Sequence, residues 1–385
     1  MATELAAMSR SFRNFLVFLG LAALALVLWL YIRDYRGRVV SNGNLTDYAA
    51  DESGNLYIIE SGKLYWMKAS QAGSILGGGR RELAISNPDR FISRTGPVVL
   101  LGNSPRKVYL LDTKYGAGYK EIGEFPSAAM SESFCASESD SPMVARLQDY
   151  YVGDASTYFR KANLEVIDFS GNIRQYEISE PSSFMKNQYA LSADGQHFVF
   201  LTESEYRADT SRSLNVLDLD NRQTRSVEIL DDGGDAFITV NEGRIAVTKM
   251  ARGVMVFDLE LNLLMESRLN CSWFPPFEDQ GAFLVIENVK AIVGLDINGN
   301  QVMNEPLAGT IEDYIISGGS LYICVRGDDS RRRYFRVDAV NRRLVTVSDL
   351  RQDYVRYLYS GALISGGRMF ISDIGGKLRS IAMSE

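Results

Sequence analysis

The chain has 385 residues, 46% of them hydrophobic and 23% charged, and a formal net charge of −7. This is the composition of a globular protein, with enough residues for one large or two medium domains. A single histidine, His197, excludes a histidine-rich metal site and leaves only one base for a Ser-His-Asp triad. The distant cysteines Cys135, Cys271 and Cys324 form neither a disulfide framework nor a CxxC pair, although one pair could bridge in an oxidising compartment.

Residues 15–32, FLVFLGLAALALVLWLYI, form an apolar run without a charge. A helix of this length reaches about 27 Å, close to the thickness of a bilayer core. Trp29 and Tyr31 lie near one end, where amphipathic rings favour the membrane interface. We therefore predict a single transmembrane helix over 15–32 that anchors the chain, preceded by a short tail, 1–14.

Two alternatives to this anchor stay open. Ala23-Leu24-Ala25 has the form of a signal-peptide cleavage site, but the apolar run continues past it to Ile32. A buried core helix is the second alternative, and no polar residue marks a solvent face for it. The basic residues on the two sides of the run are nearly equal in number, so they barely indicate orientation. The short N-terminus favours a signal anchor with the C-terminal domain exported.

The rest of the chain is acidic. Residues 1–38 hold five of the 41 basic and two of the 48 acidic residues, so the remainder has 36 basic and 46 acidic residues and a formal charge of −10. An acidic surface repels phosphate backbones. We expect no nucleic acid among the partners.

One phrase recurs along the chain after residue 38: a β-rich run, often an aspartate, a short turn and a second run. Its copies are KVYLLDTKYG (107–116), NLEVIDFSGN (163–172), SLNVLDLDNR (213–222), GVMVFDLELN (253–262), AIVGLDINGN (291–300) and YFRVDAVNRR (334–343). The repeated aspartates are Asp112, Asp168, Asp218, Asp258, Asp296 and Asp338. A first copy at 62–71 has Lys68 at this position, and a last copy at 376–385 ends the sequence. Eight copies at a period near 40 residues indicate a repeat architecture.

The flanks of each copy predict a unit of four strands. Within 236–269, AFITVNEG, RIAVTKM, GVMVFDL and NLLMESRL read as four successive strands, with Gly, Asn and Asp at the breaks. Units of this length repeated around an axis describe a β-propeller. We predict an all-β fold over 37–385, an eight-bladed β-propeller with seven blades as the alternative.

The phrase LSADGQHFVFL (191–201) is similar to the Ser-Pro-Asp-Gly turn between the first two strands of propeller blades, with Ala193 in place of the proline. With the repeat, it makes residues 38–385 resemble the quinoprotein-like and WD40-like β-propeller superfamilies. The last repeat stops one strand short. We predict that GRVVSNG (37–43) supplies the missing outer strand and closes the ring.

The run DINGN at 296–300 alternates oxygen-bearing side chains, as a calcium loop does. An EF-hand loop beginning at Asp296 would need Gly at its sixth position and Glu at its twelfth, where Gln301 and Leu307 stand. Asp and Asn bond their own backbone in turns, and Gly tolerates positive φ. We interpret the run as the turn between the third and fourth strands of a unit, and predict no metal site.

Quinoprotein dehydrogenases carry a cofactor and calcium at the propeller axis, and their blades show a tryptophan-docking pattern. Only Trp66 and Trp273 lie in the repeats of this chain, so the pattern is absent and we predict no cofactor. Acidic loops such as 231–235 could supply paired carboxylates, but they also suit solvated turns. We assign no catalytic residue, and interpret His197 as a packed or edge side chain.

The candidates for partner binding are aromatic. Trp273, Phe274 and Phe277 flank two prolines between repeats, and they would mark a partner site if exposed. Packing between neighbouring blades is the alternative. Insertions at 148–162 and 202–213 lengthen two units, and the first carries Tyr151 and Tyr158.

The leading interpretation is a single-pass protein of the cell membrane, with an extracytoplasmic propeller that acts as a non-catalytic scaffold. Its expected partners are other membrane or envelope proteins, and the lipid bilayer through 15–32. The alternative is a propeller enzyme, a hydrolase or a cofactor-dependent oxidoreductase, with its site in the axial funnel. A third is a ligand sensor that signals through the span. Likeness of fold alone is weak support for any function.

Overall fold

The computed structural model describes residues 15, 17–26, 38–41, 44–72, 79–94, 96–116, 118–126, 132–152, 159–178, 182–204, 211–230, 235–241, 243–272, 274–317, 319–350, 362–372 and 377–383.

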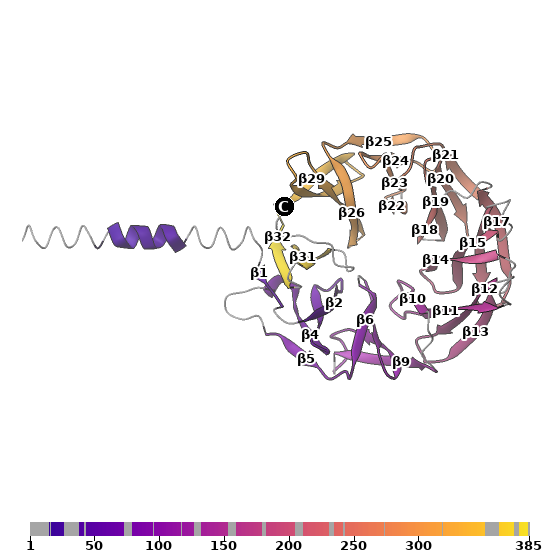
Figure 1. Cartoon of the computed structure of the whole chain (residues 1–385), viewed down its shortest axis with the longest axis horizontal. Helices are drawn as coiled ribbons and strands as arrows, with labels where there is room; N and C mark the ends of the chain where they lie inside the picture. The colour runs from indigo at the N-terminus through magenta and orange to yellow at the C-terminus, as the bar shows by residue number, and fades with distance from the viewer. Residues whose placement is uncertain are drawn as a thin grey trace, which may run out of the picture.

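Eight four-stranded antiparallel sheets stand around a central axis (Figure 1). This confirms the eight-bladed propeller and not the seven-bladed alternative. We number the blades 1 to 8 along the chain. In each blade the first strand lies next to the axis and the fourth lies at the outer edge, as Figure 1 shows. First strands of neighbouring blades contact one another from blade 1 to blade 5 and from blade 7 to blade 8, and β22 of blade 6 contacts β27 of blade 7. Strand β2 of blade 1 contacts β30 of blade 8, which closes the ring.

The first half of the ring contains blades 1 to 4. Blade 1 consists of β2 (Leu45–Ala50), β3 (Asn55–Glu60), β4 (Lys63–Lys68) and β5 (Arg81–Leu83), with a 3-10 turn η1 (Ala69–Gln71) after β4. Blade 2 consists of β6 (Pro88–Ser93), β7 (Val98–Gly102), β8 (Arg106–Leu111) and β9 (Tyr119–Phe125). Blade 3 consists of β10 (Glu132–Ala136), β11 (Val144–Val152), β12 (Phe159–Ile167) and β13 (Ile173–Ile178). Blade 4 consists of β14 (Ser182–Leu191), β15 (His197–Ser204), β16 (Arg212–Asp218) and β17 (Thr224–Leu230).

The second half contains blades 5 to 8. Blade 5 consists of β18 (Ala236–Asn241), β19 (Arg244–Lys249), β20 (Gly253–Asp258) and β21 (Leu263–Ser267). Blade 6 consists of β22 (Phe277–Asp279), β23 (Ala282–Glu287), β24 (Ala291–Leu295) and β25 (Gln301–Pro306). Blade 7 consists of β26 (Thr310–Ser317), β27 (Ser320–Arg326), β28 (Arg332–Asp338) and β29 (Arg343–Leu350). Blade 8 consists of β30 (Leu363–Ser365), β31 (Arg368–Ser372), β32 (Leu378–Ala382) and β1 (Arg38–Val39). The four strands predicted within 236–269 are those of blade 5.

The predicted closure is confirmed, because the outer strand of blade 8 comes from the beginning of the propeller. Strand β1 pairs antiparallel with β32, with Arg38 opposite Ser380 and Val39 opposite Arg379. The next residues extend the contact, since the N–H of Val40 donates to the carbonyl of Leu378 at 2.7 Å. Two segments at opposite ends of the sequence thus share one sheet, which removes a free blade edge.

The antiparallel pairing gives the ring two distinct faces. The front face carries the turns between first and second strands and those between third and fourth strands, for example residues 51–54 and 296–300. The rear face carries the turns between second and third strands and the connections between blades. Because β1 runs antiparallel to β32, Arg38 lies toward the front face, and the chain enters the propeller from that side.

The core consists of eight clusters of buried side chains, one between each pair of neighbouring blades. Between blades 3 and 4, for example, Leu164 packs with Phe198 and Phe200. The central strands of a blade are covered on both sides, so β7, VVLLG, is buried at every residue. This explains why these strands read as continuous apolar runs and not as alternating patterns.

The predicted anchor, 15–32, lies partly outside the described residues, and the tail 1–14 lies wholly outside them. Residues 15 and 17–26 are helical (Figure 1). Their large apolar side chains are exposed, from 54% for Leu19 to 69% for Phe18. Within the part of the chain that is described, no helix has both the length and the apolar character needed to cross a membrane.

Candidate functional site

The run at 296–300 is a self-bonded turn. The Oδ1 atom of Asp296 accepts hydrogen bonds from the N–H groups of Asn298 at 2.9 Å and Asn300 at 2.8 Å. The side-chain amide of Asn300 donates to Oδ2 at 3.0 Å. These bonds, first of all that from the Asn300 side chain, hold the pKa of Asp296 below its ordinary value. Both carboxylate oxygens therefore serve the turn between β24 and β25, as predicted.

The same bonds recur around the ring. In four further turns an asparagine side chain donates to the preceding repeat aspartate: Asn172 to Asp168, Asn221 to Asp218, Asn262 to Asp258 and Asn341 to Asp338. Among the residues that the structure describes, no three His, Cys, Asp or Glu side chains are grouped as metal ligands would be. The repeated aspartates are structural residues of the turns.

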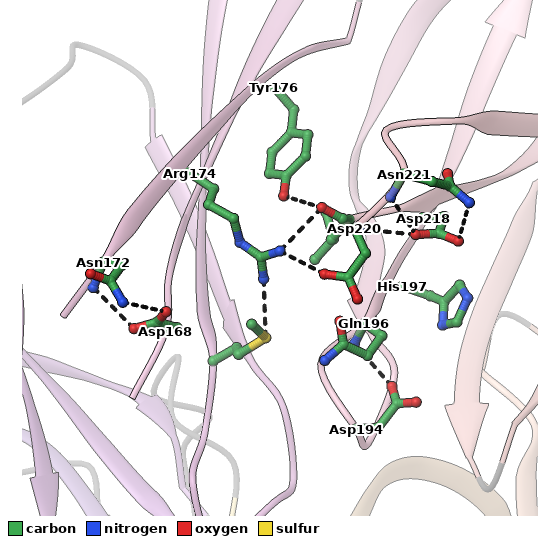
Figure 2. Close-up of polar contacts among 12 residues, drawn as sticks. Asp168, Asn172, Arg174, Tyr176, Asp194, Gln196, His197, Asp218, Asp220 and Asn221 are labelled. Carbon is green, nitrogen blue, oxygen red and sulfur yellow. Dashed lines mark hydrogen bonds and ion pairs between the residues drawn. The ribbon is translucent and has the colours of Figure 1, made fainter. Parts of the chain in front are cut away.

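These turns also hold neighbouring blades together, as Figure 2 shows for blades 3 and 4. Arg174, on the outer strand β13 of blade 3, donates to the carbonyl of Leu219 at 3.2 Å and to the carboxylate of Asp220 at 2.9 Å. The hydroxyl of Tyr176 donates to the same carbonyl at 2.5 Å. Leu219 directly follows the repeat aspartate Asp218, so the turn of one blade is bonded to the outer strand of the blade before it.

His197 is the first residue of β15, and its side chain is half-buried. Its Nδ1 atom is buried and has no hydrogen-bond partner. Figure 2 shows the ring within blade 4, beside the turns that carry Asp194 and Asp218. This is the packed or edge position that the sequence predicts.

A hollow with a volume of about 540 Å³ lies at the front mouth of the axial channel. Six blades contribute to its lining through Glu52, Gly96, Glu138, Asn241, Glu278 and Gly319. Two adjoining hollows of about 430 and 150 Å³ share Glu52 and Gly96 with it. We call this region the axial mouth.

Carboxylates dominate the axial mouth. Glu138 is exposed, but the mouth partly shields its carboxylate from water, which raises its pKa, and the repulsive charge of Glu52 raises it further. Partial burial, with the charge of Asp338, raises the pKa of Asp279 in the same way. Glu278 is neutralised by an ion pair with Arg244. The negative charge of the mouth attracts cations. Sequence analysis did not group these carboxylates, because they come from segments far apart in the chain.

A buried ion network between blades 2 and 3 is the second group that sequence reasoning missed. Arg146 of β11 is fully buried, its Nε donates to Glu165 of β12 at 2.8 Å, and Glu132 of β10 lies 3.6 Å away. The guanidinium also stands 4.6 Å from the ring centre of Phe125, in blade 2. Arg106 of blade 2 pairs with Glu132 from the other side. A charge with this many partners is a structural feature of the interface.

Those predicted partner-binding residues that the structure describes lie in different parts of the ring. Phe274 is 3% exposed and packs edge-on against Tyr314 at 5.4 Å between ring centres, in the cluster between blades 6 and 7. The ring of Phe274 therefore packs between neighbouring blades, which is the alternative to partner binding given by the sequence. Phe277 is half-buried at the start of β22 and lines the axial mouth. Tyr151 lies in β11, where its backbone pairs with Arg160, whereas Trp273 and Tyr158 lie outside the described residues. Partner binding by these residues stays a prediction.

All three cysteines are free thiols. Burial raises the pKa of Cys135, of Cys271 and of Cys324 to about 12. A thiol reacts as its thiolate, so none of the three suits a redox or nucleophilic role.

No family model matches the chain, and its sequence matches no curated protein. Solved structures do share its fold. The computationally designed Ika8 protein superposes with a TM-score of 0.57 and 12% identity over 90% of this chain and 99% of its own. Sqt1 from Chaetomium thermophilum gives 0.51 and 13% over 90% and 99%.

Dipeptidyl peptidase 4 from Porphyromonas gingivalis gives a TM-score of 0.53 and 14% identity over 90% of this chain, which spans 60% of that protein. At such identities the likenesses show the fold alone. The eight-bladed propeller is established, and its placement in the quinoprotein-like or WD40-like superfamily stays a prediction.

Proposed function

We propose that this chain is a non-catalytic protein-binding scaffold of the cell envelope. Residues 15–32 anchor it in the cell membrane as a single span, and the propeller lies outside the cytoplasm. Its partners are other membrane or envelope proteins, which bind the rear face.

One observation supports this proposal: the chain enters the propeller at the front face, whereas its long hairpins lie at the rear face. Arg38 enters at the front face. The hairpins β11–β12 and β15–β16 of the adjacent blades 3 and 4 point to the rear face, and β11 and β12 have nine residues each, against six in β19 and β20. A ring attached to a bilayer from its front side presents these hairpins away from the lipid, where another protein can reach them.

The axial mouth supports binding more than catalysis. A general acid or base needs a shielded position beside the reacting atoms. Glu52 and Glu138 are exposed to solvent, and Glu278 is paired with Arg244. These carboxylates suit electrostatic attraction of a cationic group. The enzyme alternative is tested by assaying the wild-type chain and Glu138→Gln against a panel of hydrolase substrates. If that alternative were right, the wild-type chain would turn over a substrate and Glu138→Gln would not.

Membrane anchoring is tested on the full chain with a tag after Glu385. We expect it to remain in the membrane fraction after carbonate washing. The variant Leu21→Arg/Leu24→Arg should be released, because each charge costs about 2.5–3.5 kcal/mol at the centre of a span. Protease added outside cells without an outer layer should digest the wild-type propeller. Protection until lysis would overturn the extracytoplasmic placement, and release of the wild-type chain would overturn the anchor.

Partner binding is tested by photo-crosslinking in intact cells. A photoreactive residue at position 151, in the rear hairpin, should give discrete adducts with membrane or envelope proteins. The same residue at position 63, the first residue of β4 in blade 1, also lies at the rear but outside blades 3 and 4, and serves as the matched control. Equal adducts from both positions, or none from position 151, would contradict a binding surface on the long hairpins.

A further inference from the structure

The propeller exposes few large apolar side chains, and most of them lie on the same face. Those beyond the N-terminal helix are Val39, Ile173, Met250, Leu263, Leu264, Ile297 and Val340. Met250 lies at the rear face, and Val39 lies in β1. The other five stand in turns between third and fourth strands or at the start of the fourth strand, at the front face. This is the face where Arg38 brings the chain in.

Four of these side chains lie in three successive blades. Leu263 and Leu264 are 50% and 42% exposed in blade 5, Ile297 is 39% exposed in blade 6, and Val340 is 64% exposed in blade 7. The turn that carries Ile297 rests on the outer strand of blade 5, since a Cβ on Gly299 would lie 3.3 Å from the carbonyl oxygen of Glu266. We call these four residues the apolar arc. The next blade after blade 7 is blade 8, which receives β1.

Charge separates the apolar arc from the rest of the front face. The adjoining hollow in the axial mouth is lined by one cation, Lys114, which pairs with Asp112, and by an excess of carboxylates from blades 1 to 3: Asp51, Glu52, Asp112, Glu138 and Asp140. Beside the apolar arc, the ionic groups include opposite pairs, such as Arg225 with Glu260 at 2.9 Å and Arg343 with Asp338 at 3.6 Å. Blades 1 to 3 therefore repel an anionic surface, whereas blades 5 to 7 offer apolar side chains together with arginine.

We propose that the apolar arc rests in the interface of the lipid bilayer, so that the propeller is tilted with blades 5 to 7 against the membrane and blades 1 to 3 away from it. This inference depends on the proposed membrane anchor. The proposed span ends at Ile32, and the chain from there to Arg38 reaches at most about 22 Å. That tether holds the front face near the bilayer. Exposed apolar side chains at a membrane surface enter the boundary between headgroups and acyl chains.

The test uses single cysteines that carry an environment-sensitive fluorophore. Burial keeps Cys271 and Cys324 from labelling, and the half-buried Cys135 is replaced by serine in every variant. The variants Leu264→Cys, Ile297→Cys and Val340→Cys sample the apolar arc. Ile173→Cys, on the front face of blade 3, and Met250→Cys, on the rear face, are matched controls of similar exposure, 39% and 41%. The full chain is reconstituted in phosphatidylcholine–phosphatidylglycerol vesicles and isolated by flotation.

We expect a blue shift of emission, and quenching by lipids with a nitroxide on the acyl chain, at the three arc positions and at neither control. Flotation of the chain with water-like emission at the arc would overturn the proposed contact while leaving the anchor intact. Failure of the wild-type chain to float would overturn the anchor itself. An emission shift that disappears when the protein is diluted at constant lipid would mean that the apolar arc contacts a second copy of the chain. An equal shift at Met250→Cys would mean that the fluorophore itself enters the lipid. Either result rejects the proposal.

Discussion

Arg174 and Leu219 connect two blades of the ring, through a hydrogen bond of 3.2 Å from the guanidinium to the backbone carbonyl (Figure 2). The same relationship occurs at the junctions on either side. Lys120 of β9 donates to the carbonyl of Phe169 at 3.2 Å, and Arg225 of β17 donates to that of Leu259 at 3.3 Å. In each case a cation at the second position of an outer strand bonds the residue that follows the repeat aspartate of the next blade. From blade 2 to blade 5, a side chain thus reinforces every junction.

Removing both donors to Leu219 should cost more than the sum of the single changes. Arg174→Ala leaves Tyr176 bonded to the carbonyl, and Tyr176→Phe leaves Arg174, so each should lower the free energy of unfolding by about 1 kcal/mol. The double variant leaves the carbonyl without either donor and should cost about 1–3 kcal/mol beyond their sum. Urea denaturation of the four proteins measures this coupling. Strict additivity would show that the two donors act independently.

Asp220→Ala is the matched control for the ionic part of this contact. Its carboxylate is 68% exposed, so its pair with Arg174 is screened by water. We expect a loss of less than about 0.5 kcal/mol. A loss as large as that of Arg174→Ala would mean that the ion pair, and not the bond to the carbonyl, connects the blades.

Arg146→Ala should destabilise the propeller strongly. Its guanidinium is fully buried between Glu165, Glu132 and Phe125, so truncation leaves Glu165 without a cation in a poorly hydrated interface and leaves Arg106 as the cation beside Glu132. Breaking a buried ion pair costs about 3–5 kcal/mol. Thermal and urea unfolding measure the loss. Lys63→Ala, which breaks a pair with Glu82 between side chains about half exposed, should be indistinguishable from wild type. Similar effects of the two variants would contradict the structural importance of the network.

Acid should weaken the turns that contain the repeated aspartates. Hydrogen bonds lower the pKa of Asp296, of Asp338 and of Asp218 relative to the unfolded chain. A lowered pKa in the folded state stabilises the fold above the ordinary pKa of aspartate, about 4, and this contribution is lost as the pH falls through the folded value. Asp296→Ala should therefore differ most from wild type at neutral pH, and the difference should shrink below about pH 4.

Urea unfolding of Asp296→Ala at pH 7 and pH 3 measures this change. Ile297→Ala, a neutral substitution in the same turn, should differ from wild type by the same amount at both pH values. If the Asp296→Ala difference persisted unchanged at pH 3, the carboxylate bonds would not be what stabilises the turn.

The sequence carried the local and periodic features of the fold. Runs of β-branched and aromatic residues, broken by Gly, Asn and Asp, placed the four strands of blade 5, and the period of the repeat predicted eight blades. The aspartate turns were predictable because their hydrogen bonds join residues at most four positions apart. The closing strand was predictable because one repeat lacked a strand and the residues before the first repeat could supply it.

The sequence did not predict which residues of neighbouring blades contact one another. Arg146 lies in the run VARLQDYYV, where alternation alone would place it on a solvent-facing side, and its burial comes from Glu165, Glu132 and the neighbouring blade. The apolar cluster around Phe274 could be exposed or packed, and only the position of Tyr314, 40 residues later, decides for packing. Glu52 and Glu138 meet in the axial mouth because the ring brings distant turns together.

Two copies of one turn test whether the repeats are fitted to their neighbours. Residues 51–55 and 168–172 share the pattern Asp-x-x-Gly-Asn, and in both the asparagine bonds the aspartate. Gly54 and Gly171 have φ values of +73° and +88°, which alanine adopts at a cost of about 1 kcal/mol. A Cβ at Gly54 would meet nothing within 4 Å, but one at Gly171 would stand 2.8 Å from the carbonyl oxygen of Ile122 in blade 2.

Gly171→Ala should therefore lower the free energy of unfolding by about 1–3 kcal/mol more than Gly54→Ala, because the turn has to move away from blade 2. Urea unfolding of both variants measures the difference, and equal losses would mean that the turn of blade 3 is not seated against its neighbour.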